Sequence, residues 1–475
     1  MVGPSRACAP ASTLPDRRDS AIRRFLGPAA AALLVVLAVL SPLPLAAQSP
    51  APLSADAAAE LVEDAFSLIR DHALVAPDDT ALLRAAARGV QQGLAGAGVS
   101  PPAPPVLTGT PADVPAVLEY VRAAALLMEP QPPDALVALV LRAMVRETAD
   151  PLGAVYLPAE FARFVAVLRG ERGGLGLQVD AWPDGIAVVE LVDGGPAARA
   201  GLLVGDLIAD IDGVPIRGRT PDAVMELLGG RVGTSVTVGT VRRGQPIRFV
   251  LAREQVRSIP IRARLIDARV GYIRLLEFSD QSAADLGRAL SRLTAGGACP
   301  APDEGERCKA AAILLDLRSN GGGLVDESVI IASHFLPAGL VAIEDRRAGP
   351  LMLLVRPVSP KFTGPMAVLV NGGSASASEI VAGALQDVGT PLVGAHTYGK
   401  GTVQSIFTLA AASAEWGLRL TTGRYRTRAG RAVEGLGLPP DVLVPMASSR
   451  IQGSDDIQFA AALQLVRSRL PAARP

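Results

Sequence analysis

Residues 371–404 have the sequence NGGSASASEIVAGALQDVGTPLVGAHTYGKGTVQ, and the rest of the chain can be interpreted outward from them. The apolar run MAVLV at Met366–Val370 comes directly before them, which is typical of a buried strand that ends in a turn. Small residues then lead into Glu379–Asp387, where apolar side chains recur at helical spacing. The sequence therefore predicts a serine-rich turn between a strand and a helix. Backbone N–H groups and the helix dipole there can stabilise a developing negative charge, although serines that only cap the helix are the alternative.

A lysine in the second half of this stretch is unusual for the chain. The sequence has 46 basic residues, of which only Lys309, Lys361 and Lys400 are lysines. Lys400 stands between two glycines, where arginine could supply the charge but not the ability to lose a proton. To act as a base near neutral pH, its pKa must fall by roughly 2–3 from about 10.4, which burial among apolar neighbours can achieve.

This composition suggests a serine–lysine pair, which is a variant of serine–base catalysis. Gln404 follows Lys400 by an even number of residues, so in a strand both side chains would point to one face. The amide oxygen of Gln404 could then orient the lysine nitrogen.

The motifs SASASEIVAGALQD and YGKGTVQ, in this order, resemble the signature of the carboxyl-terminal processing peptidases, also called tail-specific proteases. The resemblance implies Ser376 as the nucleophile, Lys400 as the general base and Gln404 as its orienting partner. Ser376 and Lys400 are 24 residues apart, one fewer than the family pattern leads us to expect, and a loop can absorb the difference. The implied activity is that of an exported serine endopeptidase that works through an acyl-enzyme, and we expect neither a cofactor nor a metal.

Residues 1–47 have the features of a secretory signal peptide. The apolar run at Ala29–Leu40 is preceded by Arg17, Arg18, Arg23 and Arg24, and the segment ends in small residues. The run has 12 residues, short of the ~20 that span a membrane, although an uncleaved anchor is the alternative. No cysteine follows it at the cleavage site, which argues against a lipoprotein. We expect an exported protein, in the periplasm or elsewhere in the bacterial envelope.

The cysteines agree with export. Cys8 would leave with the leader, whereas Cys299 and Cys308 bracket the polar loop CPAPDEGERC. In an oxidising compartment this pattern favours a disulfide between them. Free thiols are the second interpretation, and a metal site with two thiols and no nearby histidine is the third.

With 475 residues the chain is too long for one core, and its 46 basic and 46 acidic residues give no reason to expect a nucleic-acid partner. Residues 48–170 have helical patterns interrupted by a proline-rich linker. Near their end, at 150–157, stands DPLGAVYL, which resembles a turn of the family but lacks its histidine and serine. We derive no function for this region from the sequence; a cap, an oligomer surface and an adaptor-binding face all remain open.

Residues 171–257 change to short strands and glycine turns, and they resemble a PDZ domain. The loop formed by Gly174, Leu175, Gly176 and Leu177 would supply backbone amides to a peptide carboxylate, and an open strand edge would accept the peptide. Pro221–Leu228 is the predicted helix of that groove. The alternative is a β-module that binds nothing. Preferred substrates would be proteins or peptides with apolar C-termini, and an adaptor lipoprotein or a second copy of the chain are further possible partners.

Residues 258–447 alternate apolar strands with helices, which predicts an α/β core with a mostly parallel sheet and the site at the strand ends. The resemblance sharpens this multidomain α/β class to a crotonase-like core, followed by a C-terminal helix in 448–475. The strand Ala310–Leu317 runs into DLRSNGGG, which lacks the Gly-Lys-Ser/Thr ending of a phosphate loop. The resemblance instead implies that the N–H groups of Gly322 and Ala377 form an oxyanion hole, worth about 3 kcal/mol for each donor.

Two rival interpretations remain open. A histidine base would have to be one of three histidines, and only His396, four residues before Lys400, is a serious candidate. Glu379 and Asp387 are expected to act as capping or network residues rather than as a second base. The alternative function is a catalytically inactive PDZ scaffold that binds exported C-termini, although such a descendant would be expected to have lost Ser376, Lys400 or Gln404.

Overall fold

The computed structural model describes residues 53–75, 77–182, 185–298, 307–411, 414–453 and 455–470. The predicted signal peptide at 1–47 lies outside these residues, as do Cys299 and the side chain of Cys308, so the disulfide stays a prediction. Among the described helices, none combines the length and the apolar character needed to cross a membrane.

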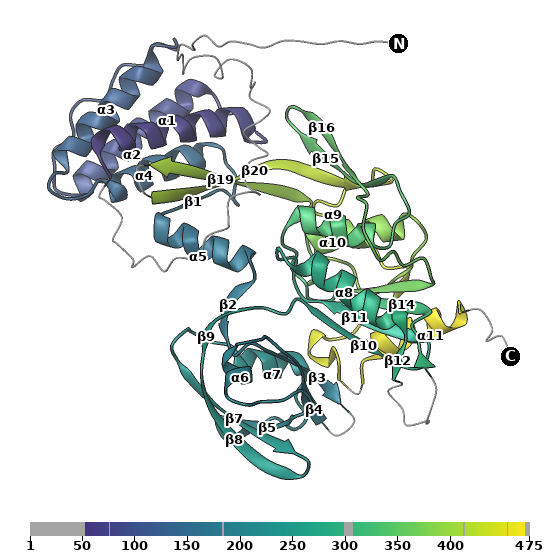
Figure 1. Ribbon diagram of the computed structural model, residues 1–475. Helices are drawn as coiled ribbons and strands as arrows, with labels where there is room; N and C mark the ends of the chain where they lie inside the picture. Colours follow the sequence, from purple (N-terminus) through teal and green to yellow (C-terminus); the bar gives the residue numbers. More distant parts are fainter. Residues whose placement is uncertain are drawn as a thin grey trace, which may run out of the picture. The chain divides into compact units, whose positions relative to one another are not determined.

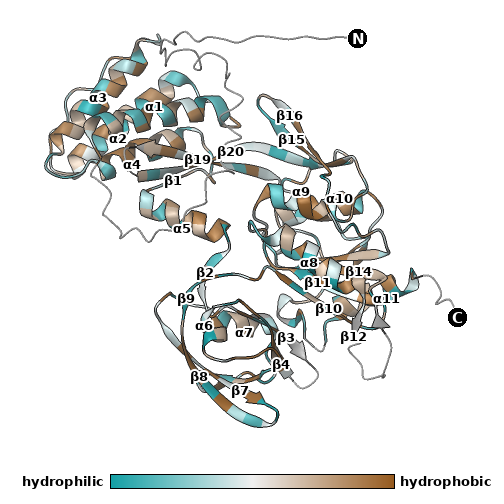
Figure 2. Cartoon of the chain, viewed as in Figure 1, coloured by the Kyte–Doolittle hydropathy of each residue, from teal (hydrophilic) through white to brown (hydrophobic). Residues whose placement is uncertain are grey.

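Four helices form the N-terminal part of the described chain: α1 (Ala55–His72), α2 (Asp79–Gly96), α3 (Asp113–Leu127) and α4 (Asp134–Glu147) (Figure 1). Ser54 and Asp78 cap α1 and α2 by accepting hydrogen bonds from the backbone, so the predicted helical stretch 54–96 is divided into two. Teal and brown alternate along these helices in Figure 2, since each buries one apolar face. β1 (Ala154–Tyr156) and α5 (Pro158–Leu168) follow.

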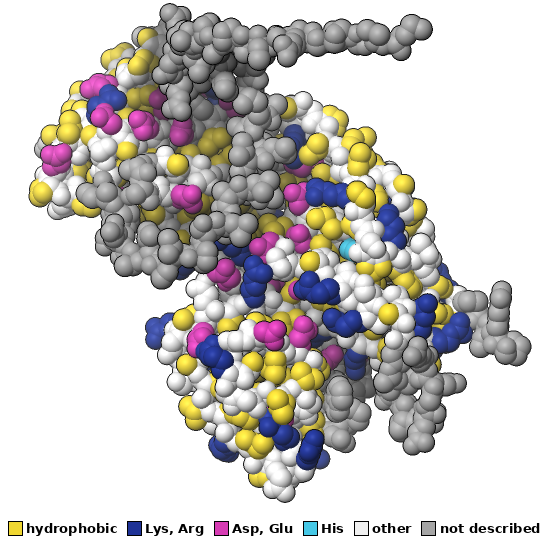
Figure 3. All heavy atoms as spheres, viewed as in Figure 1, with side chains coloured by type: hydrophobic (Ala, Val, Ile, Leu, Met, Phe, Trp, Pro, Cys, Tyr) yellow, Lys and Arg dark blue, Asp and Glu magenta, His cyan; other side chains and the backbone are white. Residues whose placement is uncertain are grey.

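The segment that resembles a PDZ domain is built from β2 (Glu171–Gly174), β3 (Leu177–Trp182), β4 (Gly185–Leu191), α6 (Pro196–Arg199), β5 (Leu207–Ile211), β6 (Val214–Pro215), α7 (Pro221–Leu228), β7 (Ser235–Arg242), β8 (Gln245–Ala252) and β9 (Glu254–Arg257). Its main sheet has the order β3-β4-β5-β7-β8, with β6 paired to β5. β3 is therefore an edge strand, and it contacts α7, whose bounds are those predicted from the sequence. On the face drawn in Figure 3, both acidic and basic side chains lie over this segment.

The core sheet has the order β10-β11-β14-β17-β18-β21. Its strands are β10 (Ile261–Leu265), β11 (Val270–Leu275), β14 (Ala312–Asp316), β17 (Met366–Val370), β18 (Leu392–Gly394) and β21 (Val442–Leu443). Only β10 runs antiparallel to its neighbour, so the predicted mostly parallel sheet is confirmed. Two strands of two residues each, β12 (Gly297–Ala298) and β13 (Arg307–Cys308), pair with each other and are not part of this sheet.

Helices cover both faces of the core sheet. Ile313 and Leu315 of β14 pack toward α8 (Ser282–Ala295), α9 (Val325–Ser333) and α10 (Ala377–Gln386), whereas Ala312 and Leu314 pack toward α11 (Ile457–Ser468). This separation follows from the alternation of side chains along a strand, and it explains why the strand is apolar throughout. A single 3₁₀ turn, Ser448–Arg450, precedes α11.

A second sheet, which the local sequence patterns do not predict, contains β15 (Leu340–Arg346), β16 (Gly349–Leu354), β19 (Thr402–Ala411) and β20 (Ala414–Thr427), together with β1. β19 and β20 form a long antiparallel hairpin. Leu409 and Trp416 near its tip are buried in the same apolar cluster as α1–α4. The segment after Lys400 is therefore held at both ends, by the core and by the N-terminal helices.

Candidate active site

Ser376 occupies the tight turn between β17 and α10, where the sequence predicted it. Its backbone has φ 56° and ψ −117°, a conformation that costs free energy for a residue with a side chain. The residue is 9% exposed. Ala377 begins α10, and its N–H has no hydrogen-bond acceptor among the described residues. A strained serine at a helix N-terminus, beside a free N–H group, suits a nucleophile whose product carries negative charge.

Glu379 is the polar centre of this site, and it is fully buried. One carboxylate oxygen, Oε2, accepts hydrogen bonds from the backbone N–H groups of Ser376 and Lys400, both at 2.9 Å. The other oxygen, Oε1, accepts from the Gly399 N–H at 2.7 Å and from the Thr397 hydroxyl. These four donors and the adjacent helix N-terminus replace the solvation that the buried charge has lost. The prediction that Glu379 is a network residue agrees with these contacts.

Lys400 lies beside Ser376 because both amides bind the same carboxylate oxygen. Burial lowers the pKa of Lys400, and the positive charge of Arg419 lowers it further, while Glu434 and Glu379 oppose the shift. A lowered pKa is what a lysine needs to act as a base near neutral pH. In the described part of the chain, however, Lys400 Nζ and Ser376 Oγ do not share a hydrogen bond, so proton transfer requires a rotation of one of these side chains or a bridging water.

The expected alternation of Lys400 and Gln404 along one strand is wrong. β19 begins only at Thr402, and the register shifts between Val403 and Gln404. Gly399 and Gly401 shape the turn before the strand, because a Cβ at Gly401 would lie 2.5 Å from the backbone nitrogen of Glu434. A turn and a bulge thus replace the regular pleat that the alternation rule requires.

Gln404 instead faces a neighbouring polar network. Its amide nitrogen lies 3.4 Å from the hydroxyl of Thr421 on β20. Asp150 accepts hydrogen bonds from the Thr421 N–H (2.7 Å) and from its hydroxyl (2.9 Å). The DPLGAVYL turn therefore reaches the strand opposite Gln404. Sequence reasoning missed Asp150 and Thr421, since a pair 271 residues apart leaves no local pattern.

The glycine loop that follows β14 lies against Ser376. A Cβ at Gly322 would come within 2.8 Å of the Ser376 Cβ and 3.0 Å of the Ala377 nitrogen, so no side chain fits there. The Gly322 N–H donates to the side-chain oxygen of Asn320 at 2.9 Å. The structure thus brings the two predicted oxyanion donors together, with the Gly322 N–H shared with Asn320.

The four residues of the predicted tail-binding loop differ in their surroundings. Gly174 ends β2, and Gly176 has φ +68°, which a side chain would strain. Leu175 and Leu177 are only 3% and 5% exposed and belong to the module's apolar core. These leucines therefore anchor the loop to the core of the module, and the backbone of the loop is the part that can contact a ligand.

The rival residues are less well placed. His396 is exposed, and within the described residues it makes no hydrogen bond. His334 is buried, and its Nδ1 bonds the carbonyl oxygen of Pro360 at 2.6 Å. His72 packs against the ring of Phe407. The described residues contain no cluster of three or more His, Cys, Asp or Glu side chains that could hold a metal ion.

Comparisons with known proteins identify the families that the chain resembles. Residues 269–444 match the model of peptidase family S41, and residues 188–242 match a PDZ domain model. The carboxy-terminal-processing protease of Bartonella bacilliformis is 36% identical over 61% of this chain and 65% of its own length. The carboxyl-terminal-processing protease of Synechocystis is 33% identical over 68% of this chain and 75% of its own length.

The match thus spans just under two thirds of the first of these relatives and three quarters of the second. Among solved structures, the photosystem II D1 C-terminal processing protease aligns with a TM-score of 0.45 at 24% identity, over 84% of this chain and 98% of that one. The serine-bearing turn, the adjacent lysine and the matched sequence models lead to one assignment: the chain belongs to the carboxyl-terminal processing proteases of peptidase family S41, serine-type peptidases, and carries a PDZ domain.

Proposed function

We propose that this protein is an exported endopeptidase that selects proteins by their C-terminal tails and cleaves them with Ser376 and Lys400. The observation that carries the proposal is the double hydrogen bond to Glu379 Oε2, which holds the backbones of both residues against one buried carboxylate. The lowered pKa of Lys400, caused first by burial, supports its role as the base.

In the proposed reaction, Lys400 Nζ takes the proton from Ser376 Oγ while the oxygen attacks the scissile carbonyl. The oxyanion is stabilised by the N–H groups of Ala377 and Gly322, the second after release from Asn320. Gln404 orients the lysine through its amide oxygen, while its amide nitrogen donates to the Thr421 hydroxyl. The leaving amine takes the proton from Lys400, and water then hydrolyses the acyl-enzyme with the lysine again acting as the base.

We further propose that the PDZ segment reads the tail. The edge strand β3 beside α7 can be extended by a peptide strand, and the backbone of the loop from Gly174 to Leu177 can receive its carboxylate. The burial of Leu175 and Leu177 means that the loop presents main chain rather than side chains. Apolar terminal residues are the proposed preference.

The remaining parts of the proposal concern the domain limits and the cellular location. The domain limits are 48–170, 171–257, 258–447 and 448–475, and the core is of the crotonase-like type. The N-terminal helices are proposed to serve an oligomer contact or an adaptor. The leader at 1–47 would direct the chain to the periplasm, where Cys299 and Cys308 could form their disulfide.

The proposed function predicts a preference that is measurable on one pair of substrates. An unfolded protein with an apolar, free C-terminus should be cleaved several-fold faster than the same chain amidated at its C-terminus, because only the free carboxylate can bind the loop amides. Ser376→Ala should abolish cleavage of both. The same Ser376→Ala protein should still bind the free tail more tightly than the amidated one in a fluorescence-anisotropy titration.

These measurements also separate the two candidate functions. A scaffold without activity would bind the free tail but leave both substrates intact in the wild-type chain. If cleavage occurs at equal rates and the two tails bind equally, the PDZ segment is not the reader of the carboxylate, and the tail-selection part of the proposal fails.

A further inference from the structure

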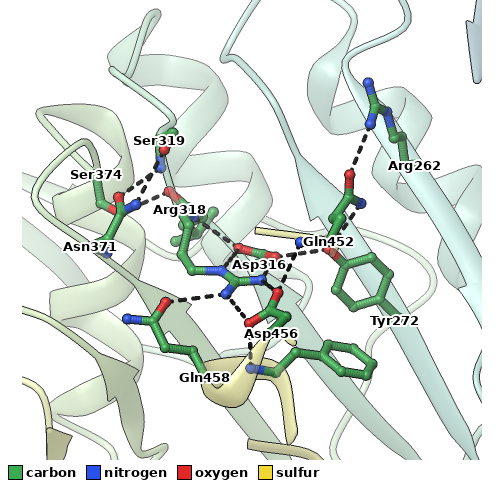
Figure 4. A network of polar contacts seen from close by, with 12 residues as sticks. Arg262, Tyr272, Asp316, Arg318, Ser319, Asn371, Ser374, Gln452, Asp456 and Gln458 are labelled. Atoms are coloured by element: carbon green, nitrogen blue, oxygen red, sulfur yellow. Dashed lines mark hydrogen bonds and ion pairs between the residues drawn. The ribbon is translucent and has the colours of Figure 1, made fainter. Parts of the chain in front are cut away.

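Arg318, two residues after the end of β14, uses every N–H of its guanidinium group (Figure 4). Nε and Nη2 donate to the two oxygens of Asp316 at 3.0 and 2.7 Å. Nη1 and Nη2 donate to the two oxygens of Asp456, both at 2.8 Å. The remaining Nη1 proton binds Gln458 Oε1 at 3.1 Å. The side chains of Arg318 and Asp316 are completely buried, and that of Asp456 is 5% exposed.

Two of these acceptors come from the C-terminal segment, about 140 residues further along the chain. Asp456 also caps α11, because its Oδ1 accepts from the Phe459 N–H at 2.9 Å and its Oδ2 from the Gln452 N–H at 3.0 Å. Gln458 donates to the carbonyl of Val444 at 2.7 Å. The segment is therefore itself well anchored before it reaches Arg318.

The electrostatic balance favours a charged and rigid cluster. Burial opposes ionisation of Asp316, but the adjacent Arg318 charge and its hydrogen bonds outweigh it and keep the pKa of Asp316 below the ordinary value. The pKa of Arg318 is raised, because the effect of its carboxylate partners exceeds that of burial. Tyr272 on β11 donates to Asp316 at 2.8 Å, so the cluster also holds the neighbouring strand. Pairing of this quality makes the loss of one partner costly.

Arg318 is followed immediately by the loop that lies against Ser376. Ser319 has φ 60°, and its N–H donates to Asn371 at 2.8 Å. The carbonyl of Asn320 accepts from the Ala375 N–H at 3.0 Å and from the Ser378 hydroxyl at 2.8 Å. Any rotation of Arg318 would thus be transmitted to Gly322 and to the turn around the nucleophile.

We infer that Asp456, acting through Arg318, is a positioning residue for the loop 319–323. This inference rests on the proposed function, because it assigns to the loop the stabilisation of the oxyanion. The C-terminal segment thereby contributes to catalysis without touching the substrate, in addition to covering one face of the core sheet. Gln458, in the first turn of α11, supports the same contact.

The test is the variant Asp456→Asn, which keeps an efficient helix cap but loses the charge and the bidentate contact with Arg318. We expect kcat to fall roughly 10- to 100-fold with KM nearly unchanged, since the loop acts on the transition state. Inhibition by a peptide boronic acid, which forms a tetrahedral adduct at Ser376, should weaken in parallel. Tail-peptide binding to a Ser376→Ala background should not change.

Asp455→Asn is the matched control. Asp455 is adjacent in sequence, and among the described residues its side chain makes only a surface ion pair with Arg450 at 3.3 Å, so its loss should leave kcat within about twofold. All rates are to be taken at the same interval below the midpoint of thermal unfolding of each variant, so that lost stability is not mistaken for lost catalysis.

The outcomes distinguish a positioning role of Asp456 from a purely structural one. An equal effect of Asp456→Asn and Asp455→Asn, or a rise in KM with kcat unchanged, would overturn the positioning role. If Asp456→Asn does not fold, Gln458→Met removes the weaker contact of Arg318, and an unchanged kcat there contradicts the inference. If the wild-type chain cleaves nothing, the proposed function fails. Amide hydrogen exchange at 319–323 then still tests the inference, because exchange that is faster in Asp456→Asn than in the wild type supports positioning of this loop by Asp456, whereas equal exchange contradicts it.

Discussion

Replacing Lys400 by arginine is expected to abolish proteolysis while leaving the protein folded. Arginine keeps the positive charge and the length of the side chain, but its guanidinium does not lose a proton near neutral pH. Removing the general base should lower kcat by at least about 10²- to 10⁴-fold, which corresponds to about 3–5 kcal/mol in the activation free energy. The measurement is hydrolysis of an unfolded protein, with circular dichroism to show that the fold persists.

The chain offers a matched control for this change. Lys309→Arg is the same substitution at an exposed residue, and its activity should stay within about twofold of the wild type. Activity of Lys400→Arg within tenfold of the wild type would contradict the Ser–Lys mechanism and would make His396 the candidate base.

The same mechanism has a pH dependence of defined sign. Burial and Arg419 lower the pKa of Lys400, so the neutral, active form becomes populated below the usual range of lysine. The value of kcat/KM should therefore rise with pH through an apparent pKa below the ordinary lysine value of about 10.4. Arg419→Gln removes a repelling charge and should move this rise to higher pH.

The second large effect is expected from Glu379→Gln. The carboxylate accepts four hydrogen bonds, from Ser376, Thr397, Gly399 and Lys400. An amide has one oxygen and one NH₂ group, so two of the four donors would face a donor inside the core. At about 1–3 kcal/mol for each buried donor left without an acceptor, the free energy of unfolding should fall by about 2–6 kcal/mol. Chemical denaturation measures this loss.

Activity should be lost as well, even under conditions where Glu379→Gln remains folded, because the carboxylate holds the serine turn and the lysine loop together. Glu434→Gln is the control for stability. Glu434 is exposed, and within the described ranges its side chain accepts a hydrogen bond only from the Gly401 N–H at 2.7 Å, an acceptor that an amide oxygen can replace. Wild-type stability and rate in Glu379→Gln would show that the two loops are positioned by other contacts.

Much of the core was predictable from local sequence. The bounds of α7 at 221–228 are those predicted from the sequence, because helical periodicity acts over a few neighbouring residues. The serine turn before α10 was predictable for the same reason: an apolar strand, small residues and an apolar helical stretch follow one another directly. Lys400 is distinguished by composition alone, because lysine is scarce in a chain that otherwise uses arginine for its positive charge.

The sequence by itself determined the chemistry available, namely a serine at a helix start, a lysine among glycines and a glycine loop after a buried strand. Only the tertiary structure decided how these groups are held. Lys400 and Gln404 do not alternate on a strand, Glu379 joins two loops, Asp150 reaches Thr421, and Asp456 holds Arg318. Propensity and periodicity are properties of neighbouring residues, whereas the partner of a buried charge is set by the packing of segments up to 271 residues apart, which leaves no signal in either segment alone.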